Sequence, residues 1–325
     1  MRRREFIGFL SAVAGLWPLT GWTQPSSRKL WRLAVLYPGD WEDEADRALF
    51  EVFREELRKL GYVEGKNLII DRRGAAGHYE RLSLLVSELV ALGPDAIVAI
   101  AAPAVAAVQR VTSTIPTVMW GVSDPVAAGF IKSLAHPGAN ITGVANMYED
   151  TIGKVLELLH SIVPAAMRMA VLMSSNSNHP RQYETTEVAA KSLGLATIPI
   201  SAPASADLEQ AFHKITQENC DVLFVLADPI RPKIVQLAAK AKIPSFFQFG
   251  AFVDLGGLAS YGASLMPMGR QTARYVARIF QGSIPSELPV ERPTAFELAL
   301  NLRTAASLGI TIPETVMARA DKVVE

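Results

Sequence analysis

Short runs of consecutive apolar residues alternate along the chain with longer segments in which apolar positions recur every three or four residues. The first run covers 31–37, and the segment from about 43 to 60 follows it with Phe53 and Leu57 on its apolar face. This spacing predicts a strand and then an amphipathic helix that ends at Gly61. The chain therefore opens with a strand followed by a helix.

The same alternation continues to about residue 247. Further strands are predicted at 68–70, 96–100, 116–120, 168–173, 196–200, 221–226 and 244–247, with a helix between successive strands. Wholly apolar strands joined by crossover helices are typical of parallel sheets that are covered on both faces. The fold class that we predict is α/β, with two doubly wound parallel-sheet lobes joined by a multi-crossing hinge.

The length of the chain agrees with two lobes, because 325 residues is about twice the size of an ordinary domain. We assign 28–144 and about 263–288 to lobe 1, and 145–262 and about 289–325 to lobe 2. The expected crossings between the lobes are 140–146, about 258–264 and 289–296.

Residues 1–25 have the layout of a signal peptide: a basic start, an apolar stretch and a polar exit. Arg3 and Arg4 precede Phe6 and Ile7, an arrangement that resembles the twin-arginine export signal. A Sec signal or a membrane anchor is the alternative. The apolar stretch is shorter than the roughly 20 residues that span a bilayer, so we expect cleavage and release into the periplasm.

Composition and motifs exclude several classes of function. The chain has 32 Lys and Arg residues and 32 Asp and Glu residues, so it carries no net positive charge that would attract nucleic acid. Cys220 is the single cysteine, which excludes an internal disulfide and the paired cysteines of a two-lobed racemase. The sequence holds no dinucleotide-binding, Walker, nucleophile-elbow or zinc-protease motif, and its five histidines are scattered. We expect no catalytic residue, no metal and no cofactor.

A ligand site is expected where the strands end, because parallel α/β sheets bind ligands beyond the carboxyl ends of their strands. At Ser123 and Asp124, side-chain oxygens either cap the following helix or face the cleft, where Asp124 suits an ammonium group and helix N–H groups suit a carboxylate. The polar run after 173 is either a solvent-facing turn or part of the cleft, and the phenylalanines after 245 are either core or ligand platform. The candidate ligand-binding residues are Tyr37, Asp40, Ala102, Pro103, Ser123, Asp124, Asn146, Asn176, Asp228, Phe247 and Tyr261.

Several segments together resemble the ABC transporter substrate-binding protein family of the tryptophan- and tyrosine-binding type. The matching segments are 53–68 (FREELRKLGYVEGKNL), 112–116 (TSTIP), 123–126 (SDPV), 137–143 (PGANITG), 256–262 (GGLASYG) and 296–302 (FELALNL). The resemblance covers nearly all of the chain beyond its first 27 residues. It implies a type I periplasmic-binding fold with three hinge crossings, a small ligand enclosed between the lobes, and partner permease and ATPase subunits at the inner membrane.

Two departures from the family pattern bear on the ligand. Members commonly carry Gly-Thr-Pro where this chain has Ala101-Ala102-Pro103, so a hydroxyl that suits a carboxylate is missing. The loop after Asp228 is also shorter than in relatives. Both departures weaken the case for an amino acid, whereas Phe247, Phe249 and Tyr261 still favour an apolar or aromatic body. We expect an aromatic amino acid or an aromatic or apolar carboxylate.

Other functions share this architecture. An exported sensor would report ligand occupancy to a membrane receptor, and an exported α/β enzyme would need an acid and base pair in the cleft. The ligand-sensing half of a transcription regulator would need an N-terminal helix-turn-helix, which 1–27 does not provide. We expect a monomeric, non-catalytic binder that closes on its ligand by hinge bending.

Overall fold

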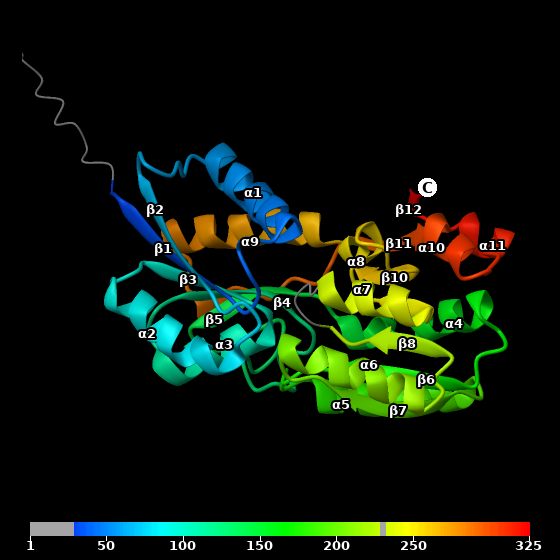
Figure 1. The fold of residues 1–325 in the computed structure, drawn as a ribbon. Helices are drawn as coiled ribbons and strands as arrows, with labels where there is room; N and C mark the ends of the chain where they lie inside the picture. The colour runs from blue at the N-terminus through cyan, green and yellow to red at the C-terminus, as the bar shows by residue number, and fades with distance from the viewer. Residues whose placement is uncertain (1–28, 228–231) are drawn as a thin grey trace, which may run out of the picture.

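The computed structural model describes residues 29–227 and 232–325. The predicted signal peptide at 1–25 and the candidate residue Asp228 lie outside this part of the chain. The described residues form two lobes, each with a central sheet that carries helices on both faces (Figure 1). This arrangement confirms the predicted α/β class.

Lobe 1 is built on a five-stranded parallel sheet of order β2-β1-β3-β4-β5. Its strands are β1 (Trp31–Tyr37), β2 (Leu68–Gly74), β3 (Ala96–Ile100), β4 (Thr117–Val122) and β5 (Ile141–Ala145). One face is covered by α1 (Glu44–Lys59) and α9 (Leu265–Phe280), and the other by α2 (Leu82–Ala91) and α3 (Ala101–Val111).

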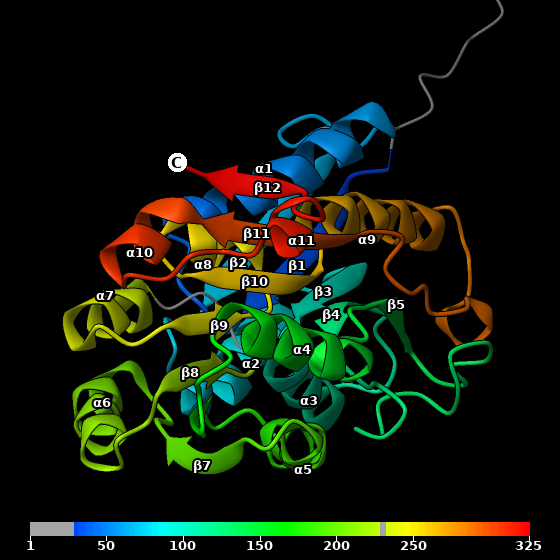
Figure 2. The ribbon, with the colours of Figure 1, turned by 90° about the vertical axis from the view of Figure 1, so that its right-hand side faces the viewer.

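Lobe 2 is built on a seven-stranded sheet of order β12-β11-β10-β9-β8-β6-β7, which Figure 2 shows from its lobe 2 side. Its strands are β6 (Arg168–Met173), β7 (Ala196–Ser201), β8 (Val222–Val225), β9 (Ser245–Phe247), β10 (Ala259–Ala263), β11 (Phe296–Asn301) and β12 (Lys322–Val324). One face packs against α4 (Ile152–Ile162), α5 (His179–Ser192), α10 (Leu302–Ser307) and α11 (Glu314–Met317). The other face packs against α6 (Leu208–Gln217), α7 (Pro232–Ala241) and α8 (Gly250–Asp254).

Four short 3-10 helices complete the described elements. They are η1 (Tyr79–Arg81), η2 (Tyr148–Thr151), η3 (Ser205–Asp207) and η4 (Pro285–Glu287). No helix in 29–227 or 232–325 combines the length and apolar character needed to cross a bilayer.

Helix α1 shows how the sequence pattern produces the fold. Phe53 and Leu57 have no exposed surface and pack in the lobe 1 core. Acidic residues occupy the first turn and basic residues the last turn, which complements the helix dipole. Gly61 follows with a φ of +90°, a conformation that glycine adopts without steric cost. Local sequence and tertiary packing therefore agree over this element.

The chain passes between the lobes three times, after β5, between β10 and α9, and before β11. Val290 packs in the lobe 1 core, and the Glu291 N–H donates to the Gly143 carbonyl at 3.0 Å. The chain therefore leaves the lobe 1 core after Glu291 and enters the lobe 2 sheet with β11 at Phe296. The two outer strands, β10 and β11, pair antiparallel, so the lobe 2 sheet is mostly but not wholly parallel.

The two sheets share one winding order, since β7-β6-β8-β9-β10 repeats the order β2-β1-β3-β4-β5. Each sheet therefore reverses its winding between its first and third strands. Such a switch point leaves a crevice at the carboxyl ends of the strands, where ligands bind in open α/β sheets. The relevant crevices lie between β1 and β3 in lobe 1 and between β6 and β8 in lobe 2.

Candidate functional site

A cavity between the lobes connects the two switch points. It contains about 630 Å³ of empty volume, including open solvent. Its lining residues are Tyr37, Asp46, Leu49, Ile100, Ala101, Ala102, Trp120, Gly121, Ser123, Asn146, Asn176, Asn178, Ala227, Phe249 and Leu265. The cavity thus draws on strand exits from both lobes.

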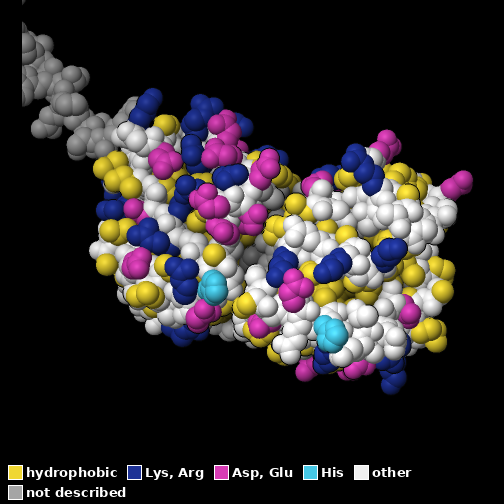
Figure 3. Space-filling model, viewed as in Figure 1, with side chains coloured by type: hydrophobic (Ala, Val, Ile, Leu, Met, Phe, Trp, Pro, Cys, Tyr) yellow, Lys and Arg dark blue, Asp and Glu magenta, His cyan; other side chains and the backbone are white. Residues whose placement is uncertain are grey.

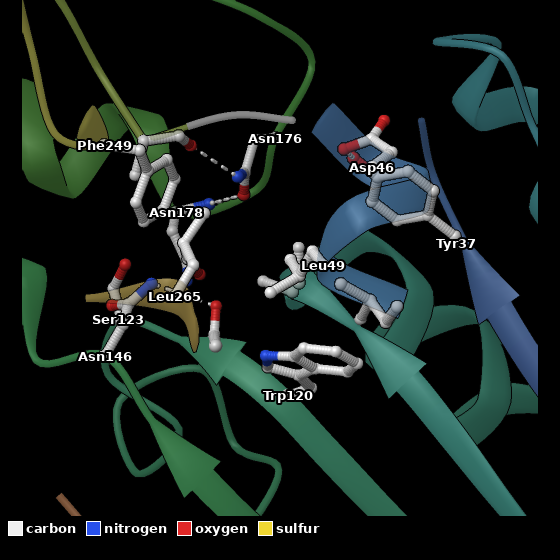
Figure 4. A pocket seen from close by; sticks show the side chains of 15 residues that line it. Tyr37, Asp46, Leu49, Trp120, Ser123, Asn146, Asn176, Asn178, Phe249 and Leu265 are labelled. Carbon is white, nitrogen blue, oxygen red and sulfur yellow. Dashed lines mark hydrogen bonds between the residues drawn. The ribbon is translucent and has the colours of Figure 1, made fainter. Parts of the chain in front are cut away.

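The cavity walls are mainly apolar. Leu49 of α1, Leu265 of α9 and Trp120 of β4 line it from lobe 1, and Phe249 lines it from lobe 2 (Figure 4). Trp120 is only 2% exposed, and its ring lies 5.5 Å from that of Phe53 in the core. An indole fixed by core packing provides a rigid apolar surface, which suits a flat apolar ligand.

A buried carboxylate stands at the lobe 1 end of the cavity. The Tyr37 hydroxyl donates to Asp46 Oδ1 at 2.8 Å, whereas Asp46 Oδ2 is buried without a hydrogen-bond partner among the described residues. Burial raises the pKa of Asp46 to about 7, and the nearby negative charges of Asp43 and Asp40 add to the rise, against the Tyr37 hydrogen bond. The described lining residues include no Lys, Arg or His.

Helix α3 presents backbone donors to the cavity. It begins at Ala101 directly after β3, and no side chain caps its N-terminus. The N–H groups of a first helical turn have no acceptor within the helix, and Ala101 and Ala102 line the cavity. Ala101 holds a φ of +63°, a left-handed conformation that is costly for a residue with a Cβ. The turn thus offers N–H groups to an anion at the cost of local strain.

Two asparagines on the opposite side hold the loops that shape the cavity. Asn146 Nδ2 donates to the Gly121 carbonyl at 3.0 Å. Asn176 Nδ2 donates to the Ala227 carbonyl at 3.2 Å and its Oδ1 accepts from the Asn178 N–H at 3.1 Å. In Figure 4 the Asn178 side chain projects into the space between these loops and Leu49. Asn146 and Asn176 therefore fix the shape of the site.

His179 is a structural cross-link behind this wall. Its Nδ1 accepts from the Ser174 N–H at 2.8 Å, and its Nε2 lies 2.8 Å from the Ala227 carbonyl, to which it donates in the tautomer that these partners require. The side chain is 1% exposed. It ties the loop after β6 to the exit of β8, the two strands that flank the lobe 2 switch point.

Polar contacts join the lobes beside the cavity. Gln182 Nε2 of α5 donates to Ser123 Oγ at 3.0 Å, and Gln182 has no exposed surface. Arg181 Nη2 lies 3.0 Å from Asp124 Oδ2, and Arg181 Nε lies 3.7 Å from Glu149 Oε2. Since Ser123 and Asp124 belong to lobe 1 and α5 to lobe 2, these contacts hold the lobes together. Figure 3 shows the furrow between the lobes from outside.

Five of the candidate residues proposed from the sequence line the cavity. They are Tyr37, Ala102, Ser123, Asn146 and Asn176. Each ends a strand or lies within a few residues of a strand end, as expected for residues near the carboxyl ends of parallel strands.

The other described candidates lie elsewhere. Asp40 is exposed, and Pro103 is buried inside α3. Asp124 accepts from the Ala127 N–H at 2.9 Å and pairs with Arg181 across the lobes. Phe247 and Tyr261 lie on strands: Phe247 stacks on Phe252 in the lobe 2 core, and Tyr261 stacks on Phe296. Phe247 lies within β9, whereas Phe249 lies beyond the carboxyl end of that strand and lines the cavity.

Sequence reasoning missed several lining residues, above all Asp46. Positions 46, 49, 50 and 53 follow the spacing of one helical face. A carboxylate on an apolar face was therefore a readable signal for a buried acid. Trp120 ends a run of apolar strand residues, and Leu265 enters from a distant segment, so neither had a local signal for a cavity.

No group of three or more His, Cys, Asp or Glu side chains within 29–227 and 232–325 has the arrangement needed to hold a metal ion. The cavity itself carries one carboxylate, Asp46, among its described lining residues. The site therefore consists of apolar walls, amides, hydroxyls, one carboxylate and backbone donors.

Comparisons with known proteins agree with this geometry. The family model for ABC transporter substrate binding proteins matches residues 42–324. A tyrosine-binding protein of Clostridioides difficile (strain R20291) is 28% identical over 261 residues, which cover 79% of this chain and 75% of the relative. A domain from Streptococcus pneumonia, solved in complex with L-Trp, is 26% identical with a TM-score of 0.82, covering 90% of this chain and 99% of that one.

A third comparison is with a ligand-free relative. The ligand-free, open structure of a substrate binding protein from Clostridium difficile is also 26% identical, with coverage of 90% and 99% and a TM-score of 0.62. The chain belongs to the ABC transporter substrate binding protein family.

Proposed function

We propose that this protein is the periplasmic solute-binding component of an ABC-type importer and that it captures an aromatic amino acid between its lobes. The observation that carries the proposal is the cavity at the facing switch points, with a rigid indole wall at Trp120 and polar groups at its ends. Relatives described as binding tyrosine and L-Trp support the ligand class.

The cavity couples ligand binding to lobe closure. Leu49, Trp120 and Leu265 belong to lobe 1, whereas Asn178 and Phe249 belong to lobe 2. A ligand that touches both sets gains contacts only when the lobes are together, so it shifts the population toward the closed state. The closed form is then the one presented to the permease and ATPase subunits.

Recognition of the ligand carboxylate falls to the N-terminus of α3. The side chains of Ala101 and Ala102 lack hydroxyls, but both residues line the cavity at the N-terminus of α3, where backbone N–H groups have no acceptor within the helix. Helix N-termini attract anions through such donors and through the helix dipole. The Ala-Ala-Pro sequence therefore does not exclude an amino acid.

The cellular setting of the proposal comes from the sequence. Residues 1–25 act as a cleaved export signal, and the protein works as a monomer in the periplasm. It undergoes no covalent chemistry with its ligand, because its task is capture and delivery.

Titration calorimetry tests the proposal. The purified protein should bind L-tryptophan, L-tyrosine or L-phenylalanine in a one-to-one complex and should not bind L-aspartate. Replacing Leu49 by Ala removes part of the cavity wall and should weaken binding about tenfold, given about 0.8 kcal/mol for each buried methylene. Leu84→Ala is the matched control, because Leu84 lies 65% exposed on α2. Flat titrations with all three aromatic amino acids contradict the proposal.

A further inference from the structure

Asp46 is a buried acid for which the described protein supplies no positive partner. It lies in the first turn of α1, is 4% exposed and lines the cavity. Its Oδ2 has no hydrogen-bond partner among the described residues. Buried polar atoms are nearly always paired, and an unpaired carboxylate in an apolar setting is costly. An unpaired carboxylate oxygen on a residue that lines the cavity indicates a partner that arrives with the ligand.

No neighbouring side chain neutralises the charge of Asp46, although the dipole of helix α1 favours a negative charge in its first turn. Its neighbours Asp40 and Asp43 carry charge of the same sign. Arg72 on the adjacent strand β2 lies over the rings of Trp41 and Phe50, at 5.4 and 4.7 Å, and forms no ion pair with Asp46 among the described contacts. Tyr37 supplies one neutral hydrogen bond, to Oδ1. Among the described residues, no side chain supplies a positive charge to Asp46.

We propose that Asp46 receives the positively charged nitrogen of the ligand, so that the cavity selects amine-bearing aromatic solutes over aromatic carboxylates that lack an amine. This inference rests on the proposed function and adds a specificity-determining residue to it. Tyr37 is a positioning residue, because its bond to Oδ1 leaves Oδ2 for the ligand.

Strand order places the amine site next to the carboxylate site. Strands β1 and β3 are neighbours, with Leu36 opposite Ala99. Adjacent strands lie about 4.8 Å apart, and Tyr37 ends β1 just as Ala101 follows β3. Asp46, which is bonded to Tyr37, and the start of α3 therefore belong to neighbouring strand exits of lobe 1 and line the same cavity. An α-amino acid carries its ammonium and carboxylate on one carbon, which matches this pair of sites.

The aromatic body then extends away from these two sites. Figure 4 shows Asp46 and Tyr37 on one side of the cavity, with Leu49 and Trp120 between them and the lobe 2 residues Asn178 and Phe249. A ligand anchored at Asp46 lays its ring over these apolar walls and reaches lobe 2. Lobe 1 therefore binds the charged end of the ligand, and closure of lobe 2 encloses its aromatic ring.

Calorimetry with three indole ligands tests the inference. L-Tryptophan carries both charges, tryptamine only the amine and indole-3-propionate only the carboxylate. The unaltered protein should bind L-tryptophan at least tenfold more tightly than indole-3-propionate, since a charge-assisted hydrogen bond is worth about ten- to a hundredfold in affinity. Asp46→Asn should lose that preference, and tryptamine binding should fall with it.

The matched control is Glu44→Gln, which removes the same charge from the exposed side of the same helical turn and should leave all three affinities unchanged. Equal affinity of the unaltered protein for L-tryptophan and indole-3-propionate overturns the inference while the proposed function stands, and this comparison needs no variant. An unchanged preference in a folded Asp46→Asn protein overturns it likewise. Absence of binding by these three ligands and by L-tyrosine and L-phenylalanine overturns both the inference and the proposed function.

Discussion

Replacing Asp46 by Asn should stabilise the ligand-free protein at alkaline pH. Burial raises the pKa of Asp46 from its ordinary 3.8 to about 7. The folded protein therefore holds the proton more tightly than the unfolded chain does between about pH 4 and 7, and its stability falls as pH rises through that window. Each pH unit is worth about 1.4 kcal/mol, so ionising Asp46 in the fold costs up to about 4 kcal/mol.

Asparagine keeps the acceptor for the Tyr37 hydroxyl and never ionises, so the variant avoids this cost. We expect its Tm to exceed that of the unaltered protein by roughly 5 °C or more at pH 8, and by only about 2 °C at pH 4.5, where about 1 kcal/mol of the cost has accrued. The measurement is calorimetric unfolding at both values, on protein refolded from denaturant to strip any retained ligand. Glu44→Gln, with the same change of charge in an exposed position, should show no such pH-dependent gain.

If Asp46→Asn and the unaltered protein have the same Tm at pH 8, the carboxylate ionises in the folded protein without a loss of stability. That result would refute the prediction. An equal gain at both pH values would also refute it, since the stabilisation would then arise from packing. The expected pattern links stability and function: the acid that weakens the empty protein is the group that we assign to the ligand amine.

Three further results are expected from other features. Ala101→Gly should raise the free energy of unfolding by up to about 1 kcal/mol in denaturant titrations, because glycine relieves the strain of the left-handed backbone. The control variant Ala104→Gly, inside the same helix, should lower the free energy of unfolding by about 0.5–1 kcal/mol. A loss of stability in Ala101→Gly would contradict the strain argument. Arg181→Ala should speed ligand release up to about fivefold in stopped-flow measurements, because an exposed ion pair with Asp124 is worth at most about 1 kcal/mol. The control variant Arg58→Ala should leave the release rate unchanged. Equal release rates in the Arg181 and Arg58 variants would show that the cross-lobe pair does not hold the lobes closed. Affinity for L-tryptophan should rise from pH 5 to 7.5 as Asp46 ionises, and a flat profile would argue against an ionised Asp46 in the complex.

Much of the fold was predictable because its signals are local. Consecutive apolar runs such as 96–100 predicted buried parallel strands, and the amphipathic segment at 43–60 predicted the helix observed at Glu44–Lys59. The antiparallel pair of β10 and β11 was not predicted. Those strands are separated by α9, which packs on the other lobe, so their pairing depends on contacts between residues distant in sequence.

The site was predictable where it depends on strand ends. Ser123 and Asn176 follow directly from the rule that ligands bind beyond parallel strands. The rule did not distinguish Phe247 from Phe249, because the residue at which β9 ends decides which of the two side chains lines the cavity. Asp46 comes from a helix, and its burial depends on the packing of α1 over the sheet. Side chains that reach the cavity from helices therefore need the tertiary structure.

The central claim is that the lobes close on an aromatic amino acid held in the cavity between them. A crystal structure of the protein grown with L-tryptophan tests it most directly. We predict one tryptophan in the cavity, with its indole against Trp120 and its ammonium nitrogen about 3 Å from Asp46 Oδ2. An empty cavity between separated lobes at saturating tryptophan, or a tryptophan bound outside the cavity, would contradict the account.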